Sequence, residues 1–477
     1  MSKGSGIAAI FAAIGGFRNS CVSSYAFSPV LNVSNMNRFK PVSTFSNSPF
    51  GSLANSKLCE RTKGATNKNK DAILLLLARM TSYFSSMVDS QSNRFYYRCL
   101  PESGVRVHGH CPIRDLGASW DTVTLLNFWN SNTDAELSVV FKKDWSATKS
   151  KLSAAIKATV EEYTRGQWHS FRGSNGRECV AMPSKFLREP SNIAHSAFLL
   201  LASTGALRLS IINELDPAVP INNFVNGILT MEQDSSGAFA IHFGSNDIHQ
   251  GIEFYPGEAL LALLDTYQFA TLQGECVKQG TTQVLAKSTQ DSVLPAVIRG
   301  FQFYSQYYRQ GNVDSHYTGF FGNWQVQCFS KLWDILHQHE VESEEPLLGE
   351  QNLADEVADY VFELCDSITS SVSWQQLMKG HFRSVSTVEI ACGLEALADG
   401  TRVAFTQLSE SRQRKCAERG GNHSTKYLPY IDKAVMFLTA VMDQVPTGAV
   451  GSGGLGHALH LSEQRLDVTG HAVNALV

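Results

Sequence analysis

Uniformly apolar segments recur along the chain at fairly even intervals, from about residue 119 to the C-terminus. The clearest runs from Tyr255 to Tyr267, where nearly every side chain after Glu258 is apolar. A segment without a polar face is typical of a helix buried on all sides, and Pro256 suits a first helical turn. Segments of the same kind begin near Ser119, Asn192, Asn323, Thr387 and Asp467.

A segment with a different pattern precedes each apolar one. In the clearest case, Asn352 to Ser371, apolar residues recur at helical spacing while acidic residues occupy the remaining positions. This pattern predicts a helix with one face in water. The expected one-sided helices are Asp71 to Val88, Ser146 to Tyr163, Ile221 to Met231, Gln290 to Arg309, Asn352 to Ser371 and Lys426 to Met442.

Six alternating pairs of one-sided and fully apolar helices predict an all-α fold. We expect residues 71–477 to form one (α/α)6 toroid of six helix hairpins, with the apolar helices inside and the one-sided helices outside. An open superhelical solenoid has a similar pattern, but six pairs favour closure. The last apolar segment stops at Val477 after about eleven residues and is shorter than the others, which weakens the case for closure.

The connections that lead into the apolar helices are long and carry short β-like or glycine-rich stretches. Examples are residues 104–108, 238–243 and 451–456. Because each such connection arrives at the N-terminus of an inner helix, all of them should lie on one rim of the toroid. We therefore expect the functional site at this rim, where ligand-binding loops concentrate.

The first seventy residues have a different composition from the rest. They are rich in Ser, Asn, Lys and Arg and contain one acidic residue, Glu60, as targeting segments do. The stretch from Tyr25 to Pro29 resembles the junction of bipartite plastid presequences. We expect residues 1–70 to be a disordered presequence for the plastid. The alternatives are a mitochondrial or secretory targeting signal, or a disordered tail without a targeting signal.

Charge and composition exclude several classes of function. The chain has a net charge of -4 and 43% hydrophobic residues, which gives no electrostatic basis for nucleic-acid binding. No apolar run reaches the roughly 18–20 residues of a membrane span, so we expect no membrane insertion of the mature chain. Ten cysteines without a C-x-x-C pair indicate buried thiols rather than a disulfide framework.

Cofactor and metal motifs are not evident. The sequence contains no G-x-S-x-G motif, P-loop or dinucleotide fingerprint. His108, His110 and Cys111 are close together, but nothing else completes a metal-ligand spacing. We therefore expect no cofactor and no metal.

Polar residues at the starts of the apolar helices are the candidate site residues. An ionised carboxylate in a fully buried helix costs folding free energy unless it is paired or functional. Glu258 and Glu389 are therefore the expected acid/base pair, with His195 or His471 as the alternative base. Helix N-termini and arginines at the same rim favour an anionic or polyhydroxylated ligand. The expected substrate-binding residues are Tyr255, Trp324, Gln325, Arg188, Arg383, Arg465 and Asp467.

Structural interpretations compete with these roles. Asn192, Asn323 and Asp467 also fit helix caps, which are the commoner use of such residues at helix starts. A single buried histidine such as His195 or His471 more often holds a neighbouring helix than a substrate.

Several stretches resemble a family of (α/α)6-toroid proteins related to six-hairpin glycosidase-like proteins and to uronate and sugar epimerases. They are residues 255–259, 320–327, 358–366, 386–399, 453–456, 465–467 and 471–472. The resemblance covers roughly the last 290 residues. It implies the toroid and, by analogy with the superfamily, a sugar-active site.

The leading functional hypothesis is a carbohydrate-active enzyme of the hydrolase, lyase or epimerase type. Each of these reactions needs an acid and a base on either side of a sugar carbon or glycosidic oxygen, and the expected partner is a sugar, uronate or glycan. The alternative is a non-catalytic toroid that binds a glycan or a partner protein. A terpenoid-cyclase-like or protein-cyclase-like ring is disfavoured, because Asp-rich motifs and a Cys-Cys-His zinc order are missing.

Overall fold

The computed structural model describes most residues from position 59 onward. The described residues are 59–109, 111–131, 145–164, 168–174, 176–183, 191–212, 221–233, 235–276, 284–314, 317–342, 352–407 and 423–477. The Tyr25 to Pro29 junction, and with it the predicted plastid address, lies outside them.

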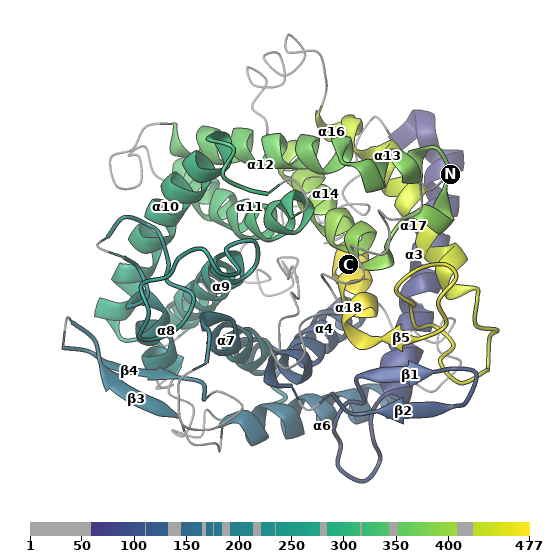
Figure 1. Cartoon of the computed structure of the whole chain (residues 1–477), viewed down its shortest axis with the longest axis horizontal. Helices are drawn as coiled ribbons and strands as arrows, with labels where there is room; N and C mark the ends of the chain where they lie inside the picture. Colours follow the sequence, from purple (N-terminus) through teal and green to yellow (C-terminus); the bar gives the residue numbers. More distant parts are fainter. Residues whose placement is uncertain are drawn as a thin grey trace, which may run out of the picture.

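Six described helices are arranged as an inner ring (Figure 1). Along the sequence, each contacts the next, and the last contacts the first. They are α4 (Pro112–Asn130), α7 (Ile193–Arg208), α9 (Tyr255–Cys276), α11 (Thr318–Glu342), α14 (Thr387–Gln407) and α18 (Leu466–Leu476). The short α18 contacts both α14 and α4.

A second layer of helices surrounds this ring (Figure 1). Each outer helix packs against one or two inner helices, as expected for helices with one apolar face. The outer helices are α3 (Cys59–Ser86), α6 (Trp145–Thr164), α8 (Ile221–Leu229), α10 (Lys287–Arg309), α12 (Leu353–Ser370) and α17 (Leu428–Met442). The described residues also form the shorter helices α13 (Val372–Met378) and α16 (His423–Lys426) and the 3-10 turn η4 (Phe382–Ser384).

The predicted mostly helical fold is confirmed, with corrections at three helix starts. Helix α4 begins at Pro112 and α11 at Thr318, several residues before the predicted positions. Polar residues such as Arg114 and Asp115 in the first turn of α4 hide the apolar pattern there. Helix α3 begins at Cys59, before the predicted Asp71. None of the described helices meets the length and apolarity required of a membrane span.

Short strands lie beside the starts of the inner helices. Strands β1 (Arg98–Leu100), β2 (Val105–Val107) and β5 (Gln464–Arg465) form an antiparallel sheet in the order β2-β1-β5. Strands β3 (His169–Arg172) and β4 (Glu178–Ala181) form a hairpin. Because β1 precedes α4 and β5 precedes α18, their pairing places both helix starts at one end of the ring, which we call the entry rim.

Contacts between the remaining inner-helix starts support the same arrangement. Asn192, just before α7, bridges His242 in the loop that leads to α9. The backbone N–H of Thr387, at the start of α14, donates to His457 in the loop before α18. Gly257 lies so close to Trp324 that a Cβ atom would approach the Trp324 side chain to 2.5 Å, which joins the starts of α9 and α11. The predicted short β-like rim segments are thus present at the entry rim.

Packed aromatic side chains fill part of the ring interior. The ring of Phe198 on α7 lies between Trp120 on α4 and Trp324 on α11, with centroid distances of 6.4 and 6.2 Å. Both tryptophans are 1% exposed. Helices α7 and α11 are separated by α9 in the ring, so the Phe198–Trp324 contact spans its inner side. The interior at this level is a packed core.

Candidate functional site

Buried polar side chains on the inner helices form two groups. The first, which we call the acidic cluster, contains Asp121, Asn323, Gln327, Cys392, Glu395, His471 and Asn474. The second, which we call the charged belt, contains Thr204, Arg208, Asp265, Gln268 and Lys331. Both groups use one face of α11, because Asn323, Gln327 and Lys331 follow one another at four-residue spacing. The belt therefore lies about one helical turn beyond the cluster along α11.

Glu395 on α14 is the centre of the acidic cluster and is 1% exposed. Three side chains meet at its Oε2 atom. Asn323 Nδ2 donates to it at 3.2 Å and Gln327 Nε2 at 3.3 Å, both from α11. His471 Nδ1 on α18 lies 3.2 Å from the same oxygen. Gln327 Nε2 also donates to Asn323 Oδ1 at 3.0 Å, which fixes the two amides relative to each other.

Asp121 on α4 is the second carboxyl of the cluster and is fully buried. Asn474 Nδ2 on α18 donates to its Oδ1 at 2.9 Å. The Asp121 carboxyl packs against the backbone of α18 at Gly470, where a Cβ atom would lie 1.9 Å from Oδ2. Gly470 is therefore required at this position, because any side chain would displace the carboxyl.

Burial dominates the electrostatics of the two carboxyls. It raises the pKa of Asp121 well above its usual value, against a lowering by the Asn474 hydrogen bond, and nearby Asp467 adds to the rise. Burial likewise raises the pKa of Glu395, which Asn323 lowers and Asp121 raises further. Among the described residues, no lysine or arginine forms an ion pair with Asp121 or Glu395. The acidic cluster therefore favours protonated carboxyls.

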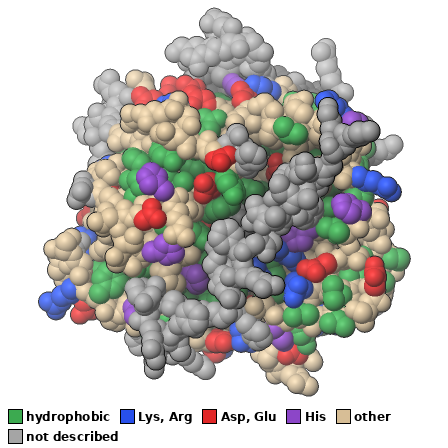
Figure 2. All heavy atoms as spheres, viewed as in Figure 1, with side chains coloured by type: hydrophobic (Ala, Val, Ile, Leu, Met, Phe, Trp, Pro, Cys, Tyr) green, Lys and Arg blue, Asp and Glu red, His purple; other side chains and the backbone are tan. Residues whose placement is uncertain are grey.

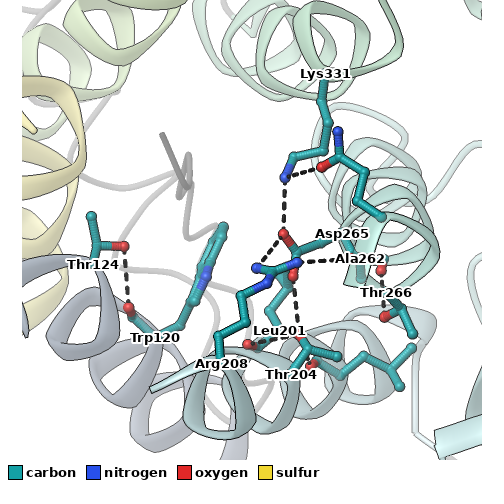
Figure 3. Close-up of polar contacts among 11 residues, drawn as sticks. Trp120, Thr124, Leu201, Thr204, Arg208, Ala262, Asp265, Thr266 and Lys331 are labelled. Carbon is teal, nitrogen blue, oxygen red and sulfur yellow. Dashed lines mark hydrogen bonds and ion pairs between the residues drawn. The ribbon is translucent and has the colours of Figure 1, made fainter. Parts of the chain in front are cut away.

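The charged belt has the opposite character (Figure 3). Asp265 on α9 accepts from Arg208 Nη1, Lys331 Nζ and Thr204 Oγ1 at 2.9, 2.9 and 3.0 Å. Lys331 Nζ also donates to Gln268 at 3.1 Å. Burial alone would raise the pKa of Asp265, but Arg208 and Lys331 outweigh it and lower that pKa. Burial lowers the pKa of Lys331 more than Asp265 raises it.

The two glutamates predicted as the acid/base pair lie on inner helices that are not neighbours in the ring. Glu258 on α9 is fully buried, and α9 is separated from α14 by α11 (Figure 1). Glu389 on α14 accepts a 2.6 Å hydrogen bond from Ser373 on α13, a helix that packs on the outer layer. Burial raises the pKa of Glu389, and the Ser373 hydrogen bond opposes that rise. The Glu389 carboxyl therefore faces α13.

The two predicted histidines have different surroundings. His195 is 8% exposed, and its Nδ1 lies 2.8 Å from Asn192 Oδ1. Burial, with a smaller effect of His242, lowers the pKa of His195 to about 4. His471 belongs to the acidic cluster through Glu395. Asn192 is the N-cap residue of α7, but its amide makes no capping hydrogen bond, because its oxygen binds His195 instead.

Three residues predicted to bind substrate are buried at the entry rim. Tyr255 is 4% exposed, and Trp324 and Gln325 are each 1% exposed. Trp324 packs against Phe198 and Gly257, so in this structure it is a core residue. Asn323 is not a helix cap, because α11 begins five residues earlier, at Thr318.

Of the predicted charged binding residues, two form a pair. The Arg465 guanidinium donates to the carboxylate of Asp467, with its Nε 2.9 Å from Oδ1. Arg465 Nη1 lies 2.8 Å from His457 Nε2. Burial would raise the pKa of Asp467, but Arg465 outweighs it and lowers that pKa. Arg383 is exposed in η4, and Arg188 lies outside the described residues.

Sequence reasoning missed the acidic cluster as a site. The apolar segment was predicted to begin near Ser119, but α4 begins at Pro112 and puts Asp121 in mid-helix. Sequence reasoning also did not select Glu395, although this residue lies in the same apolar helix as Glu389. A carboxyl in a helix that has no solvent-exposed face is the signal that could have found both residues, and it is the signal that selected Glu258.

The described part of the face seen in Figure 2 carries no dominant charge. Figure 2 shows acidic, histidine and apolar side chains interspersed over the described part of one face, with lysines and arginines scattered among them. A surface depression of about 380 Å³ lies away from both polar groups, against β3, β4 and Asn223 of α8.

No protein family, curated protein or solved structure matches the sequence.

Proposed function

We propose that the protein is an (α/α)6-toroid enzyme that performs acid–base chemistry on a sugar or uronate inside the ring. The closed cycle of inner contacts and the surrounding outer layer support this architecture. The entry rim, where strands and long loops gather, is the proposed approach for substrate. The sugar class follows from the sequence resemblance and from the amide-rich chemistry of the acidic cluster.

The convergence of Asp121 and Glu395 is the observation that carries this proposal. Side chains from α4, α11, α14 and α18 meet at one buried place, although 274 positions separate the two carboxyls along the sequence. Burying carboxyl and amide groups costs stability unless they are fully satisfied. Such groups in the interior of a fold are candidates for catalysis.

Each member of the cluster has a proposed role. Burial raises the pKa of Asp121 and so favours its protonated form, which can give its proton to the reacting oxygen as a general acid. The Glu395–His471 pair supplies the second polar centre on the other side of the reacting atom. The amides of Asn323, Gln327 and Asn474 can donate and accept, which suits the hydroxyl groups of a sugar. Because Asp121 and Glu395 are buried, substrate entry requires side chains at the entry rim to move.

The test is turnover by the full-length protein on panels of neutral and uronate oligosaccharides. New reducing ends, unsaturated ends and C5 inversion are each visible by NMR. Asp121→Asn keeps an oxygen for the Asn474 hydrogen bond but removes the proton-transfer group, so kcat should fall about 100-fold or more, with a smaller change in KM.

Glu389→Gln is the matched control, because Glu389 faces α13 and should leave kcat within about twofold of the parent. Absence of turnover on every panel contradicts the proposal. So does an Asp121→Asn variant as active as the parent.

A non-catalytic ring that binds a glycan is the second candidate, and the near-complete burial of the cluster favours it. In that case a glycan binds without being changed, and Asp121→Asn alters neither binding nor products. Isothermal titration calorimetry with the same panels, followed by NMR of the recovered glycan, separates the two candidates.

A further inference from the structure

Three chemically different metal-ligand side chains meet inside the ring. Cys392 and Glu395 lie three residues apart on one face of α14, and His471 reaches them from α18. Each offers one ligand atom, and these atoms all lie within 4.8 Å of one another. All three residues are buried, at 2%, 1% and 0% exposure. Their convergence depends on the ring bringing α14 and α18 together, so sequence spacing gave no sign of it.

A thiolate, an imidazole and a carboxylate together match the ligand set of zinc. In a tetrahedral zinc site, bonds of about 2.0–2.3 Å place ligand atoms roughly 3.3–3.8 Å apart. His471 Nδ1 and Glu395 Oε2 are already 3.2 Å apart, so only the Cys392 thiol has to move closer. Three protein ligands with a fourth position left for water or substrate is the arrangement of catalytic zinc sites.

Unpartnered acceptor atoms are a second, independent observation. Among the described residues, Glu395 Oε1, Gln327 Oε1 and Asp121 Oδ2 are buried without a hydrogen bond of ordinary geometry. All three are oxygen atoms, and they are acceptors when the two carboxyls are ionised, which is the state that a bound cation favours. The Asn323 and Gln327 amides both donate to Glu395 Oε2, and His471 Nδ1 lies 3.2 Å from the same atom, whereas Oε1 accepts no hydrogen bond of ordinary geometry. A buried surplus of acceptors is the environment that a cation satisfies.

The surrounding residues would also orient the ligands. Asn323 and Gln327 hold the Glu395 carboxyl from α11, as groups around a metal commonly hold its ligating carboxylates. The charged belt offers no comparable site, because Lys331 and Arg208 already neutralise Asp265.

We infer that Cys392, Glu395 and His471 bind a divalent transition-metal cation, and that zinc is the preferred cation. The site itself does not depend on turnover. Only the role of the metal rests on the proposed function: there it would polarise a substrate oxygen or activate a water molecule opposite Asp121. This inference replaces the sequence-based expectation of no metal.

The test is metal binding by the full-length protein. Chelator-treated protein should take up about one equivalent of Zn²⁺ per polypeptide, and its melting temperature should rise on zinc addition. With Co²⁺ it should show a thiolate-to-cobalt charge-transfer absorption and the intense visible bands of a tetrahedral site.

Variants locate the site. Cys392→Ser should abolish the charge-transfer band, and both Cys392→Ser and His471→Gln should weaken zinc binding about 100-fold or more. Cys328→Ser, which removes a buried thiol of α11 outside the cluster, should bind as the parent does. Far-UV circular dichroism of each chelator-treated variant checks that it is folded.

The outcomes separate this inference from the proposed function. If chelator-treated, folded protein binds no zinc at micromolar concentrations, or if Cys392→Ser keeps the charge-transfer band, the metal assignment is overturned. Zinc bound at this site in a protein that turns over no sugar overturns only the proposed function.

Discussion

The acidic cluster and the charged belt lie about one turn apart on α11, yet the pKa values of their buried carboxyls are shifted in opposite directions. In the belt, Asp265 is held by Arg208, Lys331 and Thr204. In the cluster, Asp121 is held by a single amide of Asn474 and by the close packing of Gly470. The pKa of Asp265 is lowered, whereas that of Asp121 is raised.

This difference separates a structural ion pair from a candidate site. A buried carboxylate with two cations remains charged and ties three helices together, and losing it leaves those cations uncompensated. A buried carboxyl without a cation retains its proton and weakens the fold as the pH rises. Such a group is retained at the expense of stability, which is typical of functional sites.

The largest expected effect comes from making the same substitution in both groups. Asp265→Asn removes the charge that balances Arg208 and buried Lys331, so the free energy of unfolding should fall by about 3–5 kcal/mol. Asp121→Asn should change it by about 1 kcal/mol or less, because the parent carboxyl has no cation to lose. Urea unfolding of both variants measures the comparison, and equal losses would remove the distinction between the two groups.

The pH dependence of stability should have opposite signs for the two carboxyls. Asp265 has a lowered pKa in the folded state, so its contribution is present above the unfolded value of about 3.9 and is lost as the pH falls below it. Asp121 has a raised pKa, so between about pH 4 and its folded-state pKa only the folded state holds the proton. Stability therefore falls there as the pH rises, by up to about 1.4 kcal/mol per unit.

Unfolding curves from pH 4 to 8 should show Asp121→Asn gaining stability relative to the parent as the pH rises. The parent and Asp121→Asn curves running parallel would mean that the Asp121 pKa is not raised.

A smaller effect is expected at His195, which belongs to neither group. Its folded-state pKa of about 4 lies below the unfolded value of about 6.5, so the unfolded state binds a proton that the folded state does not. Stability is therefore lost as the pH falls from about 6.5 to about 4. His195→Gln should be more stable than the parent at pH 5 by about 1–2 kcal/mol, relative to pH 7.

Turnover by His195→Gln should stay within about twofold of the parent at pH 7. A loss of 100-fold or more would restore His195 as the base.

The helices of this fold could be predicted from sequence because burial imposes a period on the residues. Segments such as residues 255–267 are apolar on nearly every side, and residues 352–371 are apolar on one side, which indicates an inner and an outer helix respectively. Helix starts were less certain: Pro112 is the N-terminal signal of α4, but Arg114 and Asp115 interrupt the apolar pattern behind it.

The candidate site was harder to predict because it depends on contacts between distant parts of the sequence. Nothing near Asp121 in sequence indicates that Asn474 and Gly470 will face it. Glu258 and Glu389 lie in the first turns of fully buried helices, where a site was expected. Glu395 lies further along α14, so the same criterion did not include it. Cys392 and Glu395 share a helix face at i, i+3, but their joining with His471 requires the closed ring.

Asp121→Asn, measured for both turnover and the free energy of unfolding on the same preparation, tests the central claim most directly. If the acidic cluster is a functional site, turnover falls about 100-fold or more while the free energy of unfolding is kept within about 1 kcal/mol or increases. A variant that loses about 3 kcal/mol or more and retains its turnover per folded molecule would show that the cluster, like the charged belt, serves the fold.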